Sequence, residues 1–309
     1  MTTCLFTHPC ALEHDMGAGH PERPERLKAV EKSLAGKEFA ALSRLQAPRG
    51  ERAAICQVHP EAYFEALESA APAQGLLRLD GDTAMNPGTW EAAMHAAGAA
   101  CAAVDAVMNR AATNAFVAMR PPGHHAETAT PMGFCFFNNI AIAARHAQKI
   151  HGASRVAIVD FDVHHGNGTQ EIFWNDPTVL YASTHQMPLY PGTGAKSERG
   201  EHDTIVNAPL RPGDGSAAFA DAMRSEVFPR IAAFQPDLIL ISAGFDAHRR
   251  DPLAQINLVE ADFAQATEDL MELAARHCGG RVVSLLEGGY DLEGLAGSAA
   301  AHVAALMGA

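Results

Sequence analysis

Residues 156–168 read Val-Ala-Ile-Val-Asp-Phe-Asp-Val-His-His-Gly-Asn-Gly, a largely apolar run that stops at two acids, two histidines and two glycines. Such a run is typical of a buried parallel strand whose carboxyl end carries chemistry. Because side chains alternate along a strand, Asp160, Asp162 and His164 are expected on one face. Asp162 and His164 can therefore converge on one metal ion, with Asp160 directly behind them.

Apolar strand-like segments alternate with longer amphipathic or alanine-rich segments along the chain. The expected strands are Thr3–Thr7, Ala115–Met119, Arg155–Asp160, Val179–Ser183, Asp237–Ser242 and Arg281–Glu287. The expected helices are Pro24–Leu34, Pro60–Ala70, Thr89–Arg110, Asn138–Ile150, Ser216–Phe234, Leu258–His277 and Leu292–Met307. This rhythm predicts an α/β fold with three layers, in which helices flank both faces of a mostly parallel central sheet. No low-complexity linker or internal repeat interrupts it, so we predict a single domain over residues 1–309.

Composition narrows the class of protein. A chain of 309 residues with 48% hydrophobic content can bury a large core, and a net charge of −13 argues against a nucleic-acid partner. No apolar run approaches the roughly 20 residues that span a bilayer. The six cysteines are scattered without a C-x-x-C pair, which predicts reduced thiols and a cytoplasmic location. The oligomeric state is left open.

Polar clusters follow three other expected strands. One strand is followed by Arg-Pro-Pro-Gly with His124 and His125, another by Ala-Gly-Phe with Asp246, and the last by Glu-Gly-Gly with Tyr290. In parallel α/β sheets, sites lie beyond the carboxyl ends of the strands. Two aspartates and one histidine make a metal site with open positions, and such oxygen and nitrogen ligands suit Zn(II) or Fe(II).

The remaining residues of these clusters indicate a reaction class. Two histidines that need not be ligands can act as base and acid on a metal-activated water. A tyrosine beside two glycines can donate a hydrogen bond to a carbonyl oxygen as negative charge develops on it. The residues therefore predict metal-assisted hydrolysis of an amide.

Several positions have a second interpretation. His165 could replace His164 as a ligand, although the alternation of side chains disfavours it, and Gly166–Thr169 could simply open a helix capped by the preceding residues. Asp82 could cap a helix that begins near Thr89 instead of taking part in the site. The loop that carries His14 and His20 could border the mouth of the site.

Seven motifs together resemble one known family. They are HPERPERL (20–27), RPPGHHAE (120–127), GFCFFNN (133–139), DFDVHHGNGTQ (160–170), YPGTG (190–194), SAGFDAH (242–248) and LEGGY (286–290). The chain resembles the zinc-dependent histone deacetylase-like amidohydrolases, which have the arginase/deacetylase fold. HHGNG and LEGGY are similar to the class II branch and its bacterial members.

The resemblance implies a role for each residue of the clusters. The zinc ligands would be Asp162, His164 and Asp246. His125 would be the general base, His124 would assist electrostatically or deliver a proton to the leaving amine, and Tyr290 would polarise the acyl carbonyl. Asp160 would orient His124, and Asn167 would hydrogen-bond to His125. Because the class I branch has an aspartate at position 167, the amide would leave His125 less basic.

The same resemblance implies residues for the tunnel and for additional ions. Gly133, Phe134 and Tyr190 would line a narrow acyl-amine tunnel, Asp82 would be the acid at its rim, and Arg26 would lie near an internal exit for acetate. A structural potassium ion would sit against Asp160, Asp162, His164 and Ser183, with a weaker second site near Phe173 and Val179.

Substrate preference is the open part of the functional prediction. The expected substrate is an acylated lysine side chain or a small acyl-amine. The first alternative is an acetylpolyamine amidohydrolase, but polyamine-preferring relatives carry a glutamate seven residues after the second zinc aspartate, and Leu253 stands there. A catalytically weak acyl-lysine binder is less favoured because every catalytic residue is present. An arginase-like enzyme with two metals is disfavoured because the expected extra carboxylates are replaced by Gly166 and His248.

Overall fold

Eight parallel strands form the central sheet of the computed structural model, which describes residues 2–308. Their order is β2-β1-β5-β10-β9-β6-β7-β8. The strands are β1 (Thr3–Thr7), β2 (Ser43–Gln46), β5 (Asn114–Val117), β6 (Val156–Asp160), β7 (Val179–Gln186), β8 (Ile205–Leu210), β9 (Leu238–Ala243) and β10 (Val282–Leu286). A separate antiparallel pair consists of β3 (Leu77–Arg78) and β4 (Ala84–Met85). The sheet confirms the predicted α/β class.

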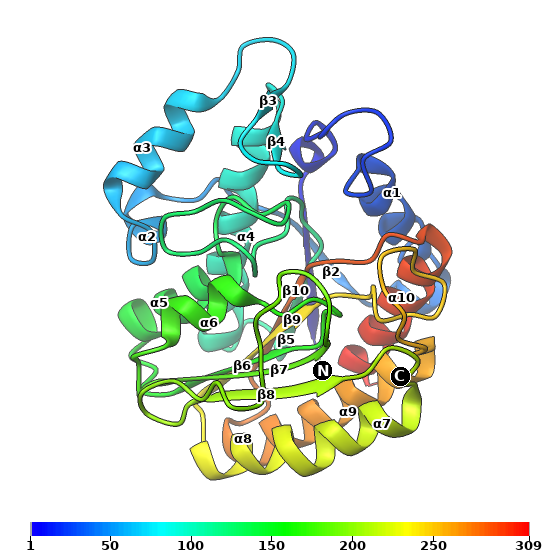
Figure 1. Cartoon of the computed structure of the whole chain (residues 1–309). Helices are drawn as coiled ribbons and strands as arrows, with labels where there is room; N and C mark the ends of the chain where they lie inside the picture. Colours follow the sequence, from blue (N-terminus) through cyan, green and yellow to red (C-terminus); the bar gives the residue numbers. More distant parts are fainter. Residues whose placement is uncertain (1, 309) are drawn as a thin grey trace.

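Helices cover both faces of the sheet and produce three layers (Figure 1). The helices are α1 (Pro24–Ser33), α2 (Arg52–Ile55), α3 (Glu61–Ala70), α4 (Thr89–Met108), α5 (Asn139–His151), α6 (Asn167–Phe173), α7 (Ser216–Ala222), α8 (Phe228–Phe234), α9 (Glu260–His277) and α10 (Leu292–Met307). On one face α4 packs beside α5, and on the other α10 packs between α1 and α9. The central strands β5, β6, β9 and β10 are buried throughout, as expected for a parallel sheet covered on both sides.

All six expected strands are present; β1 has the expected bounds, and the ends of the others differ from the expected ones by at most three residues. Two edge strands were not predicted. β2 has only intermediate and exposed residues and so lacks an apolar run, while β8 contains Asn207 and Pro209. Pro209 lacks a backbone N–H, which an outer strand tolerates because no further strand pairs with it.

The expected helix Ser216–Phe234 is divided into α7, a π-helical segment Met223–Val227, and α8. Pro229 explains the wider turn, since its ring clashes with the carbonyl four residues earlier and cannot donate a hydrogen bond. The backbone N–H of Phe228 instead bonds to the oxygen of Met223, five residues back.

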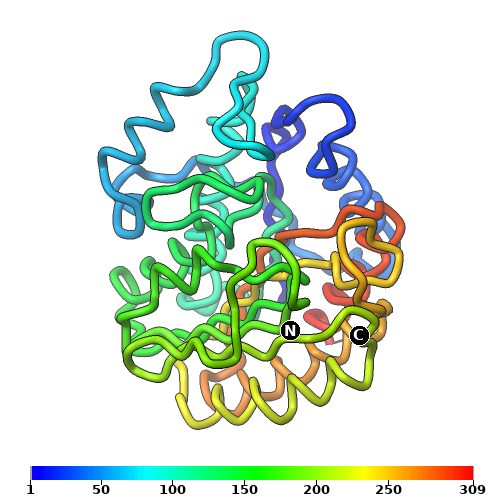
Figure 2. Tube along the Cα trace, in the orientation of Figure 1, coloured from blue at the N-terminus to red at the C-terminus, as the bar shows by residue number. Residues whose placement is uncertain are grey.

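The parallel arrangement brings the carboxyl ends of β5, β6, β9 and β10 to one edge of the sheet, where the clusters predicted to carry chemistry meet. The two ends of the described chain lie close together at the opposite edge (Figure 2), where the Thr3 hydroxyl donates to the Leu306 carbonyl over 3.3 Å. Among the described residues, no helix combines the length and apolarity needed to cross a membrane.

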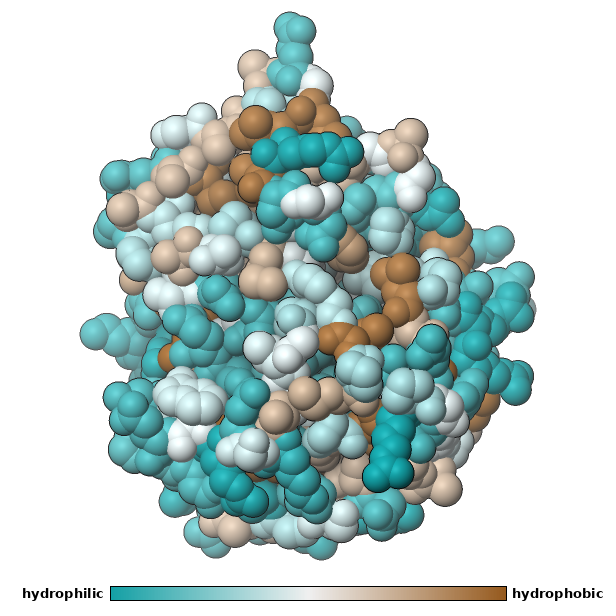
Figure 3. Space-filling model, in the orientation of Figure 1, coloured by the Kyte–Doolittle hydropathy of each residue, from teal (hydrophilic) through white to brown (hydrophobic). Residues whose placement is uncertain are grey.

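The face of the molecule seen in Figure 3 is mostly hydrophilic, with one group of apolar side chains in the upper part of the view, near α3 and the β3–β4 hairpin, and a second group to the right of the centre. Leu76 and Leu77, two of the exposed large hydrophobic residues, belong to that hairpin segment.

Candidate active site

Three buried ligand-type side chains meet where β6 and β9 end. Asp162 and His164 follow β6, Asp246 follows β9, and their ligand atoms all lie within 4.8 Å of one another. His164 Nδ1 is 3.2 Å from Asp162 Oδ1 and 3.1 Å from Asp246 Oδ2. One imidazole nitrogen therefore faces two carboxylate oxygens in a desolvated pocket, which is the arrangement that a divalent cation would bridge.

Electrostatics around this cluster also fit a cation. Burial raises the pKa of the Asp246 carboxyl, and the neighbouring Asp162 raises it further, to about 7. Burial opposes ionisation of His164, but its hydrogen bonds to the two aspartates raise its pKa to about 10. Both shifts have the same cause, since the paired carboxylates favour a positive charge at this position. The donor set of two carboxylates and one imidazole therefore fits Zn(II) or Fe(II).

Two glycines allow the carboxylates to lie against the backbone. A Cβ atom at Gly244 would collide with the carboxylate of Asp162, and one at Gly288 would collide with the carboxylates of both Asp162 and Asp246. Gly288 also donates its N–H to Asp162 Oδ2 over 2.8 Å. Glycine is therefore required at position 244 in SAGFD and at position 288 in LEGGY, because the carboxylates of the cluster lie directly against the backbone there.

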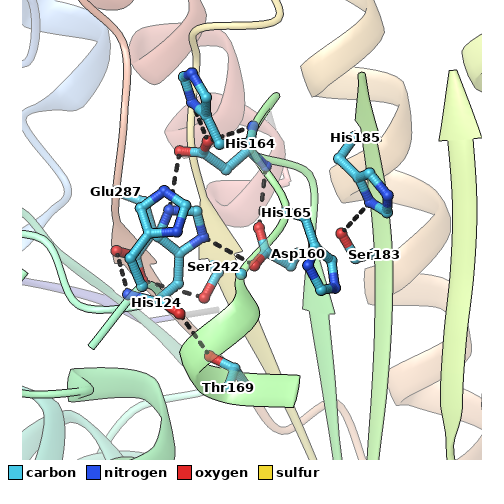
Figure 4. Close-up of polar contacts among 12 residues, drawn as sticks. His124, Asp160, His164, His165, Thr169, Ser183, His185, Ser242 and Glu287 are labelled. Atoms are coloured by element: carbon cyan, nitrogen blue, oxygen red, sulfur yellow. Dashed lines mark hydrogen bonds and ion pairs between the residues drawn. The ribbon is translucent and has the colours of Figure 1, made fainter. Parts of the chain in front are cut away.

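His124 is held by carboxylates on one side of the cluster (Figure 4). Its Nδ1 donates to Asp160 Oδ2 over 3.0 Å, and its Nε2 lies 3.9 Å from Asp162 Oδ2. Burial lowers its pKa, but the charges of Asp160, Asp162 and Glu287 outweigh burial and raise the pKa to about 10. His124 therefore carries a proton near neutral pH.

His125 has the opposite environment. Its Nδ1 donates to the amide oxygen of Asn167 over 2.8 Å, which leaves the lone pair on Nε2. Burial lowers its pKa well below the usual value, and the positive charges of His124 and His164 lower it further. Two adjacent imidazoles with pKa values pushed apart are suited to act as acid and base.

A cavity of about 230 Å³ leads from the surface to these groups. Its lining contains every residue predicted for the tunnel, together with two site histidines, Tyr290 and one unpredicted residue, Leu189. The lining residues are Asp82, His125, Gly133, Phe134, His164, Leu189, Tyr190, Leu253 and Tyr290. Of the three phenylalanines in GFCFFNN, Phe136 and Phe137 are in the core, and only Phe134 lines the cavity.

Tyr290 lies in the cavity wall with its side chain packed on two neighbours. The Phe134 ring meets it edge-on with centroids 5.9 Å apart, and the Arg26 guanidinium lies 4.9 Å from its ring centroid. Its backbone N–H donates to Asp251 Oδ2 over 2.7 Å. Among the described residues its hydroxyl has no hydrogen-bond partner, and it is available to a molecule in the cavity.

The structure decides the alternatives left open by the sequence. His165 turns away from the cluster, toward Ser183 and His185 (Figure 4), and bonds to Thr193 and Gln170, so it is not part of the ligand group. The helix-capping interpretation of Asp82 is wrong, because α4 begins after Gly88 without a side-chain cap.

The two loop histidines differ. His14 is fully buried and does not border the mouth, since it contacts Glu22 and Thr89 inside the protein. His20 supports the cavity wall: its ring meets Phe134 edge-on at 4.7 Å, and its Nε2 donates to the backbone oxygen of Asp82 over 3.0 Å.

Sequence reasoning named Arg26 but missed the other buried charges behind the site, which are Glu22, Arg120 and Glu287. Glu287 accepts hydrogen bonds from the backbone N–H groups of Gly123 and His124, and its position directly after β10 was the available signal. Glu22 forms ion pairs with Arg26 and Arg120, and all three side chains are fully buried. Arg26 also donates to the backbone oxygens of Glu287 and Gly289, which places it directly behind the Tyr290 loop.

The residues predicted to hold potassium are all buried. Asp160 and Ser183 are paired across β6 and β7, and Phe173 and Val179 lie at the end of α6 and the start of β7. The Ser183 hydroxyl is 2.8 Å from His185 Nδ1. Potassium at these positions stays a prediction.

Comparison with known proteins adds independent evidence. The model of the family described as histone deacetylase domain matches residues 20–306. The chain belongs to the histone deacetylase family. It is 41% identical to a histone deacetylase-like amidohydrolase of Pseudomonas aeruginosa, over 89% of this chain and 73% of that protein. It is 40% identical to a probable deacetylase of Archaeoglobus fulgidus, over 95% of this chain and 83% of that protein.

The fold is similar to that of a solved family member. The crystal structure of the HDA15 HD domain matches with a TM-score of 0.94 and 37% identity, covering 99% of this chain and 88% of that one. The family resemblance and the arginase/deacetylase fold class that the motifs predicted are both confirmed. Membership of this family supports a hydrolase that acts on acylated amines.

Proposed function

We propose that this histone deacetylase family protein is a metal-dependent amidohydrolase that removes an acetyl or other short acyl group from an amine. The observation that carries the proposal is one cavity of about 230 Å³ whose wall contains His125, His164 and Tyr290. A base, a member of the ligand cluster and a hydroxyl donor thus face the same small volume. An acyl carbonyl that enters the cavity would meet all three.

The two histidines would divide the proton transfers. His125 is neutral near pH 7, with its lone pair on Nε2, and would take a proton from the attacking water. His124 carries a proton that Asp160 stabilises, and would hold positive charge beside the reacting carbonyl and assist protonation of the leaving amine. This division of roles is supported by the two environments, because an amide faces one ring and carboxylates face the other.

Tyr290 would stabilise the oxygen of the acyl group as it becomes negatively charged. Its side chain lines the cavity, and its backbone N–H is fixed by Asp251. The fully buried Arg26 packs on its ring, 4.9 Å from the centroid, and limits its movement. A donor held in place before the reaction costs little reorganisation when charge develops.

Asp162, His164 and Asp246 would hold the metal ion. Zn(II) or Fe(II) bound there would polarise the carbonyl and lower the pKa of a water molecule. Zinc is the ion that the family resemblance favours, and the donor set accepts either. A potassium ion near Asp160 and Ser183 belongs to the same proposal.

An acylated lysine side chain is the substrate we propose, in a protein or a small molecule. Phe134 and Tyr190 provide apolar walls for an extended methylene chain, and Leu253 lies at the mouth with 37% of its surface exposed. Asp82 also lines the cavity, and could accept hydrogen bonds from a peptide backbone. The cytoplasmic location predicted from the scattered cysteines stays a prediction.

One specific observation keeps an acetylpolyamine as a second candidate. Asp82 and the nearby Asp80 both act on Tyr190, whose pKa burial and these negative charges raise. The cavity rim therefore carries acids that would attract a cationic amine, even though Leu253 replaces the glutamate of polyamine-preferring relatives.

The deciding experiment compares hydrolysis of an acetyl-lysine peptide, N8-acetylspermidine and a trifluoroacetyl-lysine reporter by the zinc-loaded protein. A higher kcat/KM for the peptide than for the polyamine would support a lysine deacetylase, and the reverse would support the polyamine alternative. No hydrolysis of any of the three by metal-loaded, folded protein would contradict the proposed function. His125→Ala serves as the inactive control.

A further inference from the structure

A second group of metal-ligand side chains lies between α4 and α5, outside the candidate active site. Asp105 belongs to α4, whereas His146 and His151 belong to α5. The two helices lie side by side on the same face of the sheet (Figure 1). The three ligand atoms lie within 4.8 Å of one another.

The two imidazoles converge on a single carboxylate oxygen. His146 Nε2 and His151 Nε2 are each 2.7 Å from Asp105 Oδ1. Their ring planes cross at 67°, with centroids 5.8 Å apart, so that both rings point their Nε2 atoms at one position from different directions. The cluster around His164 shows the same feature, because there too one atom lies about 3 Å from two partners that could share a cation.

We propose that Asp105, His146 and His151 form a second metal site that takes a divalent transition ion, with Zn(II) as the best-fitting one. Two imidazoles and a carboxylate are suitable zinc ligands at about 2.0–2.2 Å, and tetrahedral geometry would need nitrogen–oxygen separations of roughly 3.3 Å. Each histidine nitrogen and Asp105 Oδ1 would move about 0.6 Å further apart, from the present 2.7 Å, to reach it. Asp105 is half-exposed and can make that movement.

The surroundings leave a fourth position open. Asp105 and His146 line a cavity of about 280 Å³ that also contains Cys101. The histidine side chains are 13% and 10% exposed, so they are largely ordered by packing while the ion remains accessible from the cavity.

A third cluster, His8, Cys10 and His95, fits a metal less well. The rings of His8 and His95 are stacked with planes 15° apart and centroids 4.0 Å apart, so their in-plane lone pairs run nearly parallel and do not converge. His8 Nδ1 already accepts a hydrogen bond from the N–H of Cys10. Burial, aided by Glu91, raises the pKa of the Cys10 thiol to about 12, which disfavours the thiolate that a metal needs.

An ion in the proposed site would connect the carboxyl end of α5 to α4. His151 is the last residue of α5, and Gly152 ends the helix in the left-handed conformation at φ 68°. The ion would thus fix the end of a helix that leads directly into β6. We expect zinc to raise thermal stability and to leave turnover at the active site unchanged.

The test measures bound zinc after metal-free protein is dialysed against buffered Zn(II). We expect two equivalents in the wild-type protein and one in the His146→Gln/His151→Gln variant. Glutamine can still donate a hydrogen bond to Asp105 but removes the imidazole ligands, so the fold is preserved. His202→Gln alters an exposed histidine outside the cluster and should keep two equivalents.

A second arm separates this site from the proposed active site. Asp162→Ala should bind one equivalent, and zinc should raise its melting temperature. Adding His146→Gln and His151→Gln to Asp162→Ala should abolish both the binding and the shift. Turnover by the His146→Gln/His151→Gln variant should stay within about twofold of wild type.

The proposal would be overturned if the variant with all three substitutions, Asp162→Ala, His146→Gln and His151→Gln, still bound one equivalent of zinc. If adding Cys10→Ser then removed that equivalent, the ion would belong to His8, Cys10 and His95. A single equivalent in the wild type that Asp162→Ala abolishes would also overturn it. Failure of the proposed function would appear as absent hydrolysis with two equivalents still bound, so the two proposals are tested separately.

Discussion

Replacing Tyr290 with phenylalanine tests the proposed chemistry by removing one oxygen atom. The ring would keep its edge contact with Phe134 and its contact with Arg26, and the backbone bond to Asp251 would be unaffected. Among the described residues the hydroxyl has no hydrogen-bond partner, so its loss should hardly change the free energy of unfolding. The metal ligands are also untouched, so zinc content should stay at the wild-type level.

We expect the substitution to raise the free energy of the transition state. Loss of one oxyanion donor typically lowers kcat by about 10²–10³, which corresponds to about 3–4 kcal/mol. Because the bond would strengthen only as charge develops, kcat and kcat/KM should fall together while KM changes little. The assay is steady-state hydrolysis of the best acyl-amine substrate, with zinc analysis and thermal unfolding as controls. A kcat within about threefold of wild type in a folded, zinc-loaded variant would refute the role of Tyr290.

Three further predictions use other parts of the structure. Asp162→Ala should lose the active-site metal and all hydrolysis, as measured by metal analysis and turnover after zinc dialysis; a fully active variant would exclude Asp162 as a ligand. Asn167→Asp places a negative charge at His125 Nδ1 and should raise the pKa of that base; since the base must be neutral, the acid limb of kcat/KM should move to higher pH, and an unchanged profile would exclude the contact. Burial lowers the pKa of His302 to about 3, so the unfolded chain, with an ordinary histidine pKa near 6.5, binds more protons and stability falls as pH drops below that value. From pH 7 to pH 5 the wild type should lose about 2 kcal/mol more than His302→Gln in urea unfolding, and equal losses would show that His302 is protonated in the folded state.

Parts of the fold could be predicted because they depend on local patterns. The buried strands β6, β9 and β10 are nearly continuous apolar runs, and their period and length identify them without tertiary information. The edge strand β2 could not be predicted in this way, since it has no buried residue and is held by pairing with β1. In β8 the apolar residues are interrupted by Asn207 and Pro209, which hide the pattern of a strand. The π-helical segment Met223–Val227 is caused by the single residue Pro229, and the apolar periodicity of the helix does not reveal such a local change.

In the candidate site, too, some features could be predicted from the sequence and others depend on the tertiary structure. Strand alternation led the sequence analysis to pair Asp162 with His164, but β6 ends at Asp160 and both residues lie in the bend beyond it, so the tertiary structure decides how they converge. The motifs after the other strands supplied Asp246, His125 and Tyr290. The opposite protonation of His124 and His125 was decided by tertiary structure, because it depends on which carboxylates and amide surround each ring.

The cluster of Asp105, His146 and His151 shows the limit most clearly. Its residues come from two helices and are separated by 41 and 46 positions from Asp105 to the two histidines, without a recognisable motif. Local sequence determines residues whose spacing follows a strand or helix period. Convergence between helices is set by how they pack on the sheet, and only the tertiary structure decides it.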